Sequence, residues 1–304
     1  MIPMNIVISV PVDENLAAFI GKKGSENSIT FYNRKLEKDV VVALYPNQED
    51  EKVYALAQSL LLSTQVVLST SAIDRRFGEA LIAASLLGHP MLLTDDNDAE
   101  GILRGSGVSG YRVVSRAELF NVVCGNAQPA GEGEPVRVDI DKGFPVKGVG
   151  TVALGIVSRG VIKQHDKLYH TSGKLVTVRG LQSQDVDIMS AGRGTRVGVS
   201  LKDITHEDIG KGDLLTATVV NKAGKVSIEF KTSKMAPEKV VEGAQYRLVI
   251  GFAFSDCAVT KVDGNVMELE LKAKLPAEVG AEVLLIRKAM PRIFASGSVK
   301  GILG

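Results

Sequence analysis

The stretch from Asp141 to Val152, which reads DKGFPVKGVGTV, decides how the second half of the chain folds. Gly148 and Gly150 flank a single valine, and the residues that follow alternate between larger apolar and smaller side chains. Glycine accepts the backbone angles of a tight turn, and alternation with a period of two indicates a β-strand with one buried face. The stretch therefore predicts a glycine-bearing β-hairpin, with Lys147 placing a positive charge beside its tip. As turn glycines, the two residues need no ligand.

Outward from this hairpin, short strands separated by glycine-bearing turns continue along the chain. Residues 136–219 show this texture without helical periodicity, which predicts a small β-barrel. Residues 220–304 repeat the texture, and in the clearest strand Leu269, Leu271 and Ala273 alternate with charged residues. That alternation predicts a second barrel, whose strands have one buried and one hydrated face.

Residues 1–127 mix strand and helix patterns and are expected to form an α/β domain. Because the expected strands and helices alternate along the chain, the sheet is predicted to be mostly parallel. Residues 128–135 read QPAGEGEP, a proline- and glycine-rich stretch that suits a linker to the first barrel. The expected strands lie at 6–10, 40–44, 65–68, 91–93 and 111–114, and the expected helices at 53–62 and 74–87, the second ended by Gly88.

Composition narrows the class of protein. The chain has 304 residues, of which 45% are hydrophobic and 23% charged, so it fits a folded protein of two or three domains and excludes wholesale disorder. A net charge of +1 means that any site for a polyanion must be local. Residues 1–127 hold 11 basic and 15 acidic residues, whereas residues 128–304 hold 25 and 20. The second half is therefore the expected side for an anionic partner.

Cysteine usage and hydropathy indicate a compartment. Cys124 and Cys257 lie far apart without a CxxC spacing, so neither a zinc site nor a disulfide framework is expected, and a reducing environment fits. No run approaches the roughly 18 consecutive apolar residues of a membrane span, and no basic region precedes an apolar stretch at the N-terminus. We expect a cytoplasmic protein without membrane contact, metal or cofactor.

Several local motifs favour structural roles over chemistry. Gly21–Ser25 is basic but lacks the spacing of a phosphate-binding P-loop, so it is interpreted as an exposed turn, with a remnant anion site as the alternative. Gly105–Gly110 has the spacing GxGxxG but precedes a strand instead of a helix, which favours a loop. Asp95–Asp98 lacks the glycine and distal glutamate of an EF-hand. The histidines belong to no nucleophile motif: His89, His165, His170 and His206.

Residues 136–216 resemble the second domain of the translational GTPases, the small barrel of elongation factor Tu and its relatives. The resemblance rests on the stretch from Asp141 to Val152, on Gly155 and on three further motifs. The form FxVKGxG is more similar to the selenocysteine-specific elongation factors than to elongation factor Tu, and residues 291–298 are similar to the end of their third domain. The further motifs are Ser158–Lys163, Ala191–Gly194 with Val197–Val199, and Ile209–Leu215.

In that family the barrel holds the aminoacylated end of a tRNA, so the resemblance implies a pocket for RNA or for an aminoacyl end. The positions that match the pocket of the selenocysteine-specific factors are Asp141, Lys142 and Lys211. The family usually has arginine at both lysine positions, and the rigid guanidinium can bind an anion through two parallel hydrogen bonds, whereas lysine cannot. Basic residues on nearby loops are expected to contact phosphates. The full expected set is Asp141, Lys142, Lys147, Gly148, Gly150, Arg159, Lys163 and Lys211.

The resemblance also implies that residues 1–127 are a shortened, degenerate P-loop-GTPase-like domain. After the first strand, Pro11–Glu14 stands in place of the phosphate loop. Tyr45–Gln48 stands in place of the family's Asp-x-x-Gly, and Thr94–Asn97 in place of its guanine-reading Asn-Lys-x-Asp. A bound triphosphate depends on several charge-assisted hydrogen bonds worth about 1.5–3 kcal/mol each. With these contacts missing, we expect no nucleotide-binding residue, no catalytic residue and no GTP hydrolysis.

These observations predict a non-enzymatic, translation elongation factor-like protein that binds tRNA, the ribosome or another structured RNA through its barrels. DNA is not an expected partner. One alternative is a protein-binding adaptor or regulator, whose partner covers the vacated nucleotide cleft. A second alternative is a residual GTP-binding elongation factor with an unfamiliar phosphate loop at Gly21–Ser25.

Overall fold

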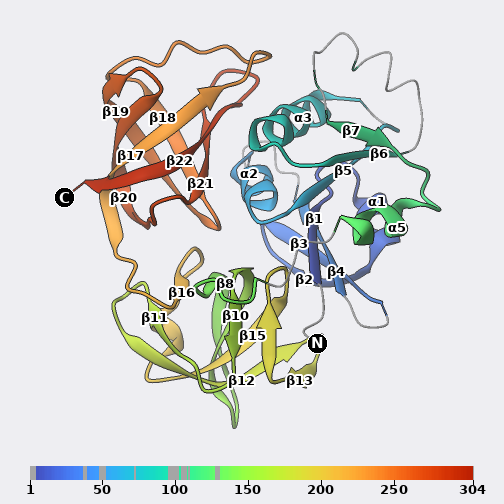
Figure 1. The fold of residues 1–304 in the computed structure, drawn as a ribbon, viewed down its shortest axis with the longest axis vertical. Helices are drawn as coiled ribbons and strands as arrows, with labels where there is room; N and C mark the ends of the chain where they lie inside the picture. The colour runs from blue at the N-terminus through green and yellow to red at the C-terminus, as the bar shows by residue number, and fades with distance from the viewer. Residues whose placement is uncertain are drawn as a thin grey trace.

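The computed structural model describes residues 5–303 except 37–39, 48–52, 72, 95–102, 104–107, 109 and 127–130. These residues form an α/β domain followed by two β-barrels, as Figure 1 shows from blue to red, so the predicted fold class is confirmed. The limits 1–127, 136–219 and 220–304, with a linker at 128–135, remain our proposal for the division into domains. In the described part of the chain, no helix is both long and apolar enough to cross a membrane.

The sheet of the α/β domain has the strand order β2-β3-β4-β1-β5-β6-β7. Neighbours from β4 to β7 run parallel, as predicted, whereas β2 and β3 form an antiparallel hairpin that extends the sheet beyond β4. The central strands β1 and β5 are buried along their full length, because helices cover both faces of the sheet. The strands are β1 (Asn5–Ser9), β2 (Lys22–Glu26), β3 (Ile29–Lys35), β4 (Val40–Pro46), β5 (Gln65–Ser69), β6 (Met91–Thr94) and β7 (Tyr111–Val113).

The described helices divide between the two faces of this sheet. α1 and α5 pack on one face, and α2 and α3 pack on the other, where they also contact the second barrel (Figure 1). Asp13 and Asp74 cap the N-termini of α1 and α3. Gly88 ends α3, as the sequence predicts, and does so in the left-handed conformation. The helices are α1 (Glu14–Ile20), α2 (Val53–Leu61), α3 (Arg75–Leu87) and α5 (Leu119–Gly125).

Parts of the α/β domain differ from the sequence-based expectation. The sequence patterns do not indicate α1, β2, β3 or α5. The interpretation of Gly21–Ser25 as a turn is wrong, because most of this segment lies in the exposed strand β2. Its polar sequence carries no strand signal, and pairing with β3 supplies the hydrogen bonds that make it a strand. Asp95–Asp98 and most of Gly105–Gly110 lie outside the described residues.

The first barrel is a closed ring with the order β11-β16-β8-β9-β15-β12, closed by pairing of β11 with β12, and β13 extends it beyond β12. β8 and β9 form the predicted hairpin, whose Gly148 and Gly150 have φ angles of 82° and 100°. Val138, Ile140 and Val199 belong to its buried core. Its elements are β8 (Arg137–Val146), β9 (Gly150–Arg159), β10 (Val161–Lys163), β11 (Lys167–His170), β12 (Leu175–Ser183), β13 (Val186–Ile188), β14 (Ser190–Gly192), β15 (Arg196–Lys202), the 3₁₀ helix His206–Asp208 and β16 (Leu214–Thr216).

The second barrel closes in the order β17-β20-β19-β18-β21-β22. Leu269 and Leu271 are buried, as predicted, but Ala273 is exposed. The expected alternation fails there because the pairing of β20 with β19 stops at Leu271, and the Ala273 N–H donates to Ser255 Oγ (2.8 Å) instead. The strands are β17 (Lys222–Thr232), β18 (Gln245–Ile250), β19 (Ala253–Asp263), β20 (Val266–Pro276), β21 (Glu282–Ile286) and β22 (Ile293–Leu303).

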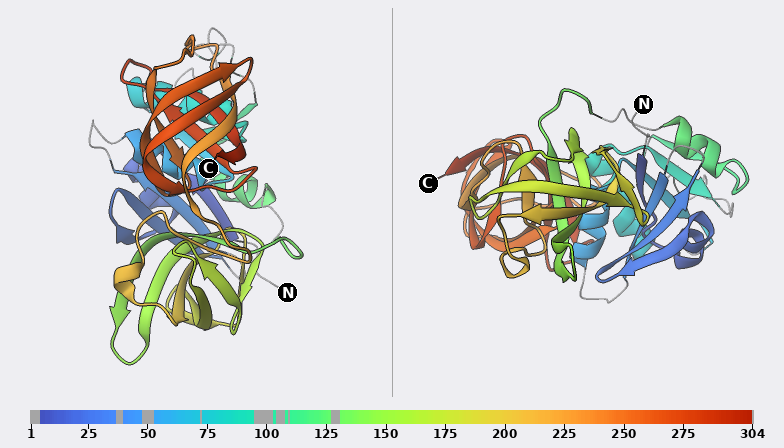
Figure 2. Two further views of the ribbon diagram at one scale, coloured as in Figure 1. Left: turned by 90° about the vertical axis from the view of Figure 1, so that its left-hand side faces the viewer. Right: turned by 90° about the horizontal axis from the view of Figure 1, so that it is seen from below.

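One apolar cluster joins all three units. It contains Val7, Phe31 and Leu44 from the sheet, Ile156 from the first barrel and Phe252 from the second, and all five are almost completely buried. Figure 2 shows both barrels against the α/β domain, consistent with a shared core.

Two glycines allow the units to approach closely. A Cβ atom on Gly194 of the first barrel would lie 2.2 Å from the carbonyl oxygen of Asn5 in the α/β domain. A Cβ atom on Gly251 of the second barrel would lie 2.3 Å from Asp139 Oδ1 in the first. Both glycines also have positive φ angles, so a larger residue would be strained and would push the units apart.

Candidate functional site

At the carboxyl end of β1, the chain enters a helix almost at once. Open α/β sheets bind ligands outside the carboxyl ends of their strands, so this is the expected position of a phosphate loop. Only residues 10–13 separate β1 from α1. Asp13 Oδ1 accepts hydrogen bonds from the backbone N–H groups of Asn15 (2.8 Å) and Leu16 (3.2 Å). A carboxylate of the chain therefore occupies the N–H groups that a phosphate would use at a helix N-terminus.

A second carboxylate lies beside this helix start. Glu14 accepts a hydrogen bond from the Tyr32 hydroxyl (2.7 Å) and lies 3.7 Å from Lys23 Nζ. Burial, together with the Glu14 carboxylate, raises the pKa of Tyr32, so the phenol remains a donor. The carboxylates of Asp13 and Glu14 thus both lie at the start of α1, where Arg116 is 3.8 Å from Asp13 and Lys23 is 3.7 Å from Glu14.

Asn47, the residue directly after β4, forms hydrogen bonds with the β2–β3 hairpin. The Asn47 N–H donates to the carbonyl of Ser28 (2.9 Å), and Asn47 Oδ1 accepts from Thr30 Oγ1 (2.7 Å). The Asn47 side-chain amide also donates to the carbonyl of Asn27. Asn47 therefore fastens the β2–β3 turn to β4.

The candidate pocket of the first barrel centres on Asp141, which is buried and paired with Arg196, a residue that the sequence interpretation misses. Arg196 Nη2 donates to Asp141 Oδ2 at 2.9 Å, and Lys211 Nζ lies 3.8 Å from Asp141 Oδ1. The Arg196 guanidinium lies over the ring of Phe31, 3.5 Å from the centroid, in cation–π geometry. One carboxylate thus holds two cations where the first barrel meets the α/β domain.

Arg196 is buried, whereas Lys211 is partly open to water, its side chain being 26% exposed. Burial lowers the pKa of Arg196 and of Lys211, and the Asp141 carboxylate opposes the shift in each case. One feature of the sequence could have indicated Arg196. It is a charged residue at the start of the apolar strand β15, and a cation buried there needs a partner of opposite charge. That partner lies 55 positions away, so the pattern alone does not identify it.

Four of the predicted site residues lie on the β8–β9 hairpin and are not in contact with Arg196 or Lys211 in any hydrogen bond or ion pair that the described residues form. Lys142, Lys147, Gly148 and Gly150 are exposed. No atom lies within 4 Å of the position of a Cβ on either glycine. The hairpin tip therefore offers open backbone and positive charge to a partner.

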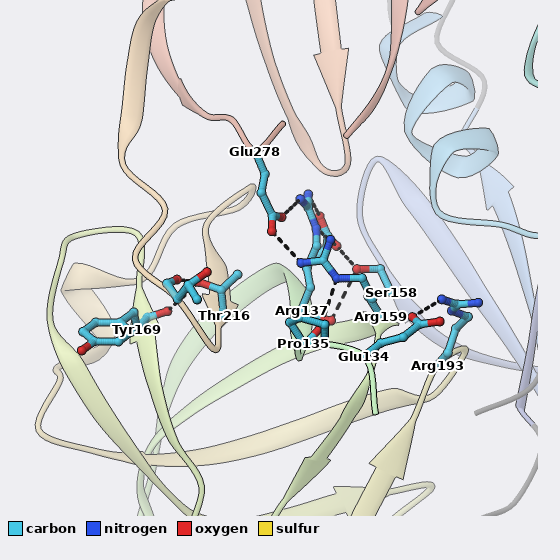
Figure 3. A network of polar contacts seen from close by, with 11 residues as sticks. Glu134, Pro135, Arg137, Ser158, Arg159, Tyr169, Arg193, Thr216 and Glu278 are labelled. Carbon is cyan, nitrogen blue, oxygen red and sulfur yellow. Dashed lines mark hydrogen bonds and ion pairs between the residues drawn. The ribbon is translucent and has the colours of Figure 1, made fainter. Parts of the chain in front are cut away.

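Arg159 and Lys163 lie elsewhere on the first barrel. Arg159 Nη2 donates to Glu278 Oε1 of the second barrel (2.5 Å), and Glu278 Oε2 accepts from Arg137 Nη1 (2.9 Å), as Figure 3 shows. Arg159 thus joins the barrels. Lys163 is exposed, and its backbone N–H donates to Asp166 Oδ2 (2.7 Å). Of the eight predicted residues, the structure brings Asp141 and Lys211 into contact and distributes the others over the hairpin, the barrel–barrel contact and an outer strand.

The sequence of the chain was compared with those of known proteins. No family model matches the chain. An uncharacterised protein of Methanocaldococcus jannaschii is 26% identical over 284 residues, which cover 90% of this chain and 92% of that protein. Elongation factor 1-alpha of Cenarchaeum symbiosum is 34% identical over 115 residues, 38% of this chain and 26% of the factor. The selenocysteine-specific elongation factor of Haemophilus influenzae is 29% identical over 100 residues, 33% of this chain and 16% of the factor. The match thus spans only a minor part of either elongation factor.

Solved structures share the fold of the chain. The elongation factor SelB of Methanococcus maripaludis, in complex with the GTP analogue GppNHp, has a TM-score of 0.81 and 20% identity and covers 100% of this chain and 80% of SelB. A bacterial selenocysteine-specific factor gives 0.78 and 17%, covering 97% of this chain and 58% of that protein. The chain therefore shares the fold of these elongation factors, and the predicted resemblance to the translational GTPases is confirmed, whereas the predicted degeneracy of the α/β domain remains a prediction. Its relatives in sequence include elongation factor 1-alpha and the selenocysteine-specific elongation factors.

Proposed function

We propose that this protein is an elongation-factor-like protein that has lost GTP binding and hydrolysis. It binds tRNA, the ribosome or another structured RNA through its barrels, in the cytoplasm and without a cofactor. The observation that carries the proposal is the Asp13 carboxylate, which caps α1 directly after β1.

The energetics of phosphate binding support the loss of nucleotide. A triphosphate needs backbone N–H donors and cations, and each charge-assisted hydrogen bond contributes about 1.5–3 kcal/mol. Here the first N–H groups of α1 are already bonded to Asp13, and Glu14 adds a second negative charge. The residues between the strand and the helix, Val10 to Asp13, include no glycine, so the GxxxxGK[ST] pattern does not begin there.

Calorimetric titration with GTP and with GDP, each in the presence of Mg²⁺, tests this part of the proposal. We expect no heat of binding at micromolar protein concentrations. SelB of Methanococcus maripaludis, which was solved with a GTP analogue, serves as the positive control. Tight, magnesium-dependent binding by this chain would contradict the proposal.

The charge of the barrels supports RNA as the partner. Lys142 and Lys147 stand exposed on a hairpin whose tip has two uncovered glycines, so phosphates can reach both charge and backbone. The excess of basic residues also lies in residues 128–304. Binding that depends on phosphate contacts weakens steeply as salt concentration rises.

Filter binding or fluorescence anisotropy with total tRNA and with ribosomes tests RNA binding at about 50 mM salt, where phosphate contacts are strongest. We expect measurable binding by the wild type. In a double Lys142→Gln, Lys147→Gln variant, the slope of the logarithm of the binding constant against the logarithm of the salt concentration is expected to become shallower by about one for each lysine removed. A Lys22→Gln, Lys35→Gln variant at two exposed positions of the α/β domain is the matched control for lost charge. If the wild-type chain binds neither RNA, this part of the proposal fails.

A protein-binding adaptor is the second candidate function, and an aromatic surface on α1 and α5 favours it. Phe19 of α1 is 42% exposed and lies 6.0 Å, centroid to centroid, from the ring of Phe120 on α5. Arg116 lies over Phe19, and Arg34 over Phe120. Exposed aromatic and arginine side chains are typical of protein contacts. Affinity capture from nuclease-treated lysate distinguishes this function, because an adaptor keeps its partners when RNA is removed.

The third candidate, a residual GTP-binding factor, has less support. Its suggested phosphate loop at Gly21–Ser25 lies mostly in strand β2 and does not form a loop. The nucleotide titration above decides this alternative.

A further inference from the structure

A cavity of about 660 Å³ lies on the second barrel, where α2 of the α/β domain packs against β18 and β21. Its walls come from the neighbouring strands β20, β19, β18 and β21, from the segment between β21 and β22, and from Val53 of α2. Cavities of roughly 300–1,000 Å³ are typical of sites for small molecules. Asp13 and Asp141 are not among the residues that line it, so this cavity is separate from the sites described above.

The hollow follows from one small residue on β19. Ala258 alternates with Cys257 and Val259, whose side chains are buried, so its methyl group lies on the outer face of the strand. In the strand pairing it stands between Gln245 of β18 and Glu270 of β20, and both of these longer side chains are exposed. The short side chain at the centre leaves room for a ligand between them.

The walls hold hydrogen-bond donors that the chain itself does not use. Five cations and two carboxylates line the cavity. Lys272 and Lys288 are exposed, and neither forms an ion pair with any residue that the structure describes. Arg247 donates to Asp256 through Nε (2.8 Å), which leaves its two terminal nitrogens without a hydrogen bond in the described part of the chain. A phosphate group, with three terminal oxygens, suits such a set of donors.

Two further arginines of the wall are already fixed in place. Arg287 donates through Nε to the carbonyl of Pro291 (3.0 Å) and through Nη1 to Glu238, so that among the described residues only its Nη2 lacks a partner. Arg292 donates through Nε (3.0 Å) and Nη2 (2.8 Å) to the buried Glu79. Because these side chains are held before a ligand arrives, binding costs little of their conformational freedom.

The two sides of the cavity differ in chemistry. The strand order β20-β19-β18-β21 places Arg247 and Lys288 on one side, and Glu270 with Lys272 on the other. The Glu270 carboxylate and the Gln245 amide make no side-chain hydrogen bond within the described residues. A carboxylate repels a phosphate but accepts hydrogen bonds from hydroxyl groups, and an amide can do both. The cavity therefore fits a molecule with a phosphate at one end and hydroxyl groups at the other.

We propose that this cavity is a binding site for a phosphorylated sugar. The phosphate lies against Arg247, Arg287 and Lys288, and the sugar hydroxyls lie against Gln245 and Glu270. A free sugar phosphate and the phosphorylated 5′ end of an RNA share this chemistry, and the experiment distinguishes the two sources. The site does not depend on the proposed RNA-binding function of the barrels.

Isothermal titration with ribose 5-phosphate tests the site, with ribose as the uncharged comparison. We expect the wild type to bind the phosphorylated sugar, and a double Arg247→Gln, Lys288→Gln variant to raise the Kd at least about tenfold, since both lost donors are charged. Lys231→Gln, Lys234→Gln, at exposed positions of the same barrel outside the cavity, is the matched control and should bind as the wild type does. Thermal melting of each variant checks that the chain remains folded.

A second pair of variants separates the cavity from mere surface charge. Ala258→Trp fills the hollow without changing its charge and should abolish binding, whereas Ala273→Trp, at an exposed position of β20 outside the cavity, should leave binding unchanged. Equal binding by the two tryptophan variants would refute the site, as would equal binding by the wild type and the double glutamine variant.

Two RNA oligonucleotides of one sequence, with a 5′-phosphate or a 5′-hydroxyl, identify the source of the ligand. A free sugar phosphate as ligand predicts binding of ribose 5-phosphate and equal affinity for the two RNAs. Preference for the phosphorylated RNA, lost in Ala258→Trp, assigns the RNA end to the site. If ribose 5-phosphate does not bind and the two RNAs do not differ, the site is refuted. Failure of tRNA binding alone would overturn the proposed function and leave this site standing.

Discussion

Arg196 illustrates at the scale of one residue how a cation is accommodated in an interface. Its guanidinium is buried, pairs with Asp141 and lies on the face of Phe31, so charge, hydrogen bond and aromatic ring replace part of the lost water. Removing one member of a buried ion pair leaves the other charge uncompensated, and this costs more than the intact pair contributes.

Replacement of the pair tests this account. Arg196→Met leaves the Asp141 carboxylate buried without its main partner, and we expect a loss of about 3–5 kcal/mol in the free energy of unfolding. The double variant Arg196→Met, Asp141→Leu removes both charges and is expected to recover most of that loss. Urea denaturation followed by circular dichroism measures both. An unchanged unfolding midpoint in the single variant would refute the assigned role.

At the scale of elements, the sequence predicts those that bury one regular face. α3 has a capping aspartate, an apolar face and a terminal glycine, and its predicted range matches the structure within one residue. β2 reads KKGSE and is fully exposed, so its strand state depends on β3 and not on its own residues. α5 reads LFNVVCG, whose β-branched residues do not suggest a helix.

For the candidate site, too, the sequence predicts what lies in one continuous segment and misses what depends on a neighbouring element. Asp141 could be predicted because it belongs to a continuous motif. Its partner Arg196, and Ser25, which accepts a hydrogen bond from Arg196, come from other elements, and only the folded chain brings them together. Contacts between distant segments are therefore the part that local sequence patterns do not contain.

The contact between α2 and α3 makes the stability of the folded chain depend on pH. His89, just after α3, has its Nε2 2.9 Å from the carbonyl of Leu60 on α2, and burial lowers its pKa. The unfolded chain therefore binds the proton more readily, so this contribution to stability is present above the ordinary histidine pKa of about 6.5 and is lost as the pH falls below it.

We expect the wild type to lose more stability than His89→Gln when the pH is lowered from 7 to 5, by at most about 1.4 kcal/mol per pH unit. Urea midpoints at several pH values measure the difference. The glutamine side chain can still donate to Leu60, which controls for the lost hydrogen bond. Parallel pH profiles in the two proteins would refute the assignment.

At the scale of the whole molecule, the units are joined by more than linkers. The apolar cluster around Phe31 includes residues of both barrels. Glu79 on α3 is buried and accepts hydrogen bonds from the N–H (2.8 Å), Nε (3.0 Å) and Nη2 (2.8 Å) of Arg292 in the second barrel. The domains should therefore unfold together.

Differential scanning calorimetry should show one cooperative transition for the wild type. Glu79→Ala leaves Arg292 without its carboxylate and is expected to cost about 3 kcal/mol and to lower the transition temperature. Lys300→Ala, which removes an exposed ion pair with Glu229, is the matched control and should change little. Two or more resolved transitions in the wild type would contradict the single cooperative unit.

The position of Phe252 determines how the protein can be divided for experiments. This side chain lies on the turn between β18 and β19, yet it is buried among residues of the α/β sheet. A fragment with the barrels alone would expose Phe252 and Ile156 to solvent as part of a hydrophobic surface, which favours self-association. Truncated preparations would therefore tend to precipitate, and genetic dissection by point substitution is the sounder route.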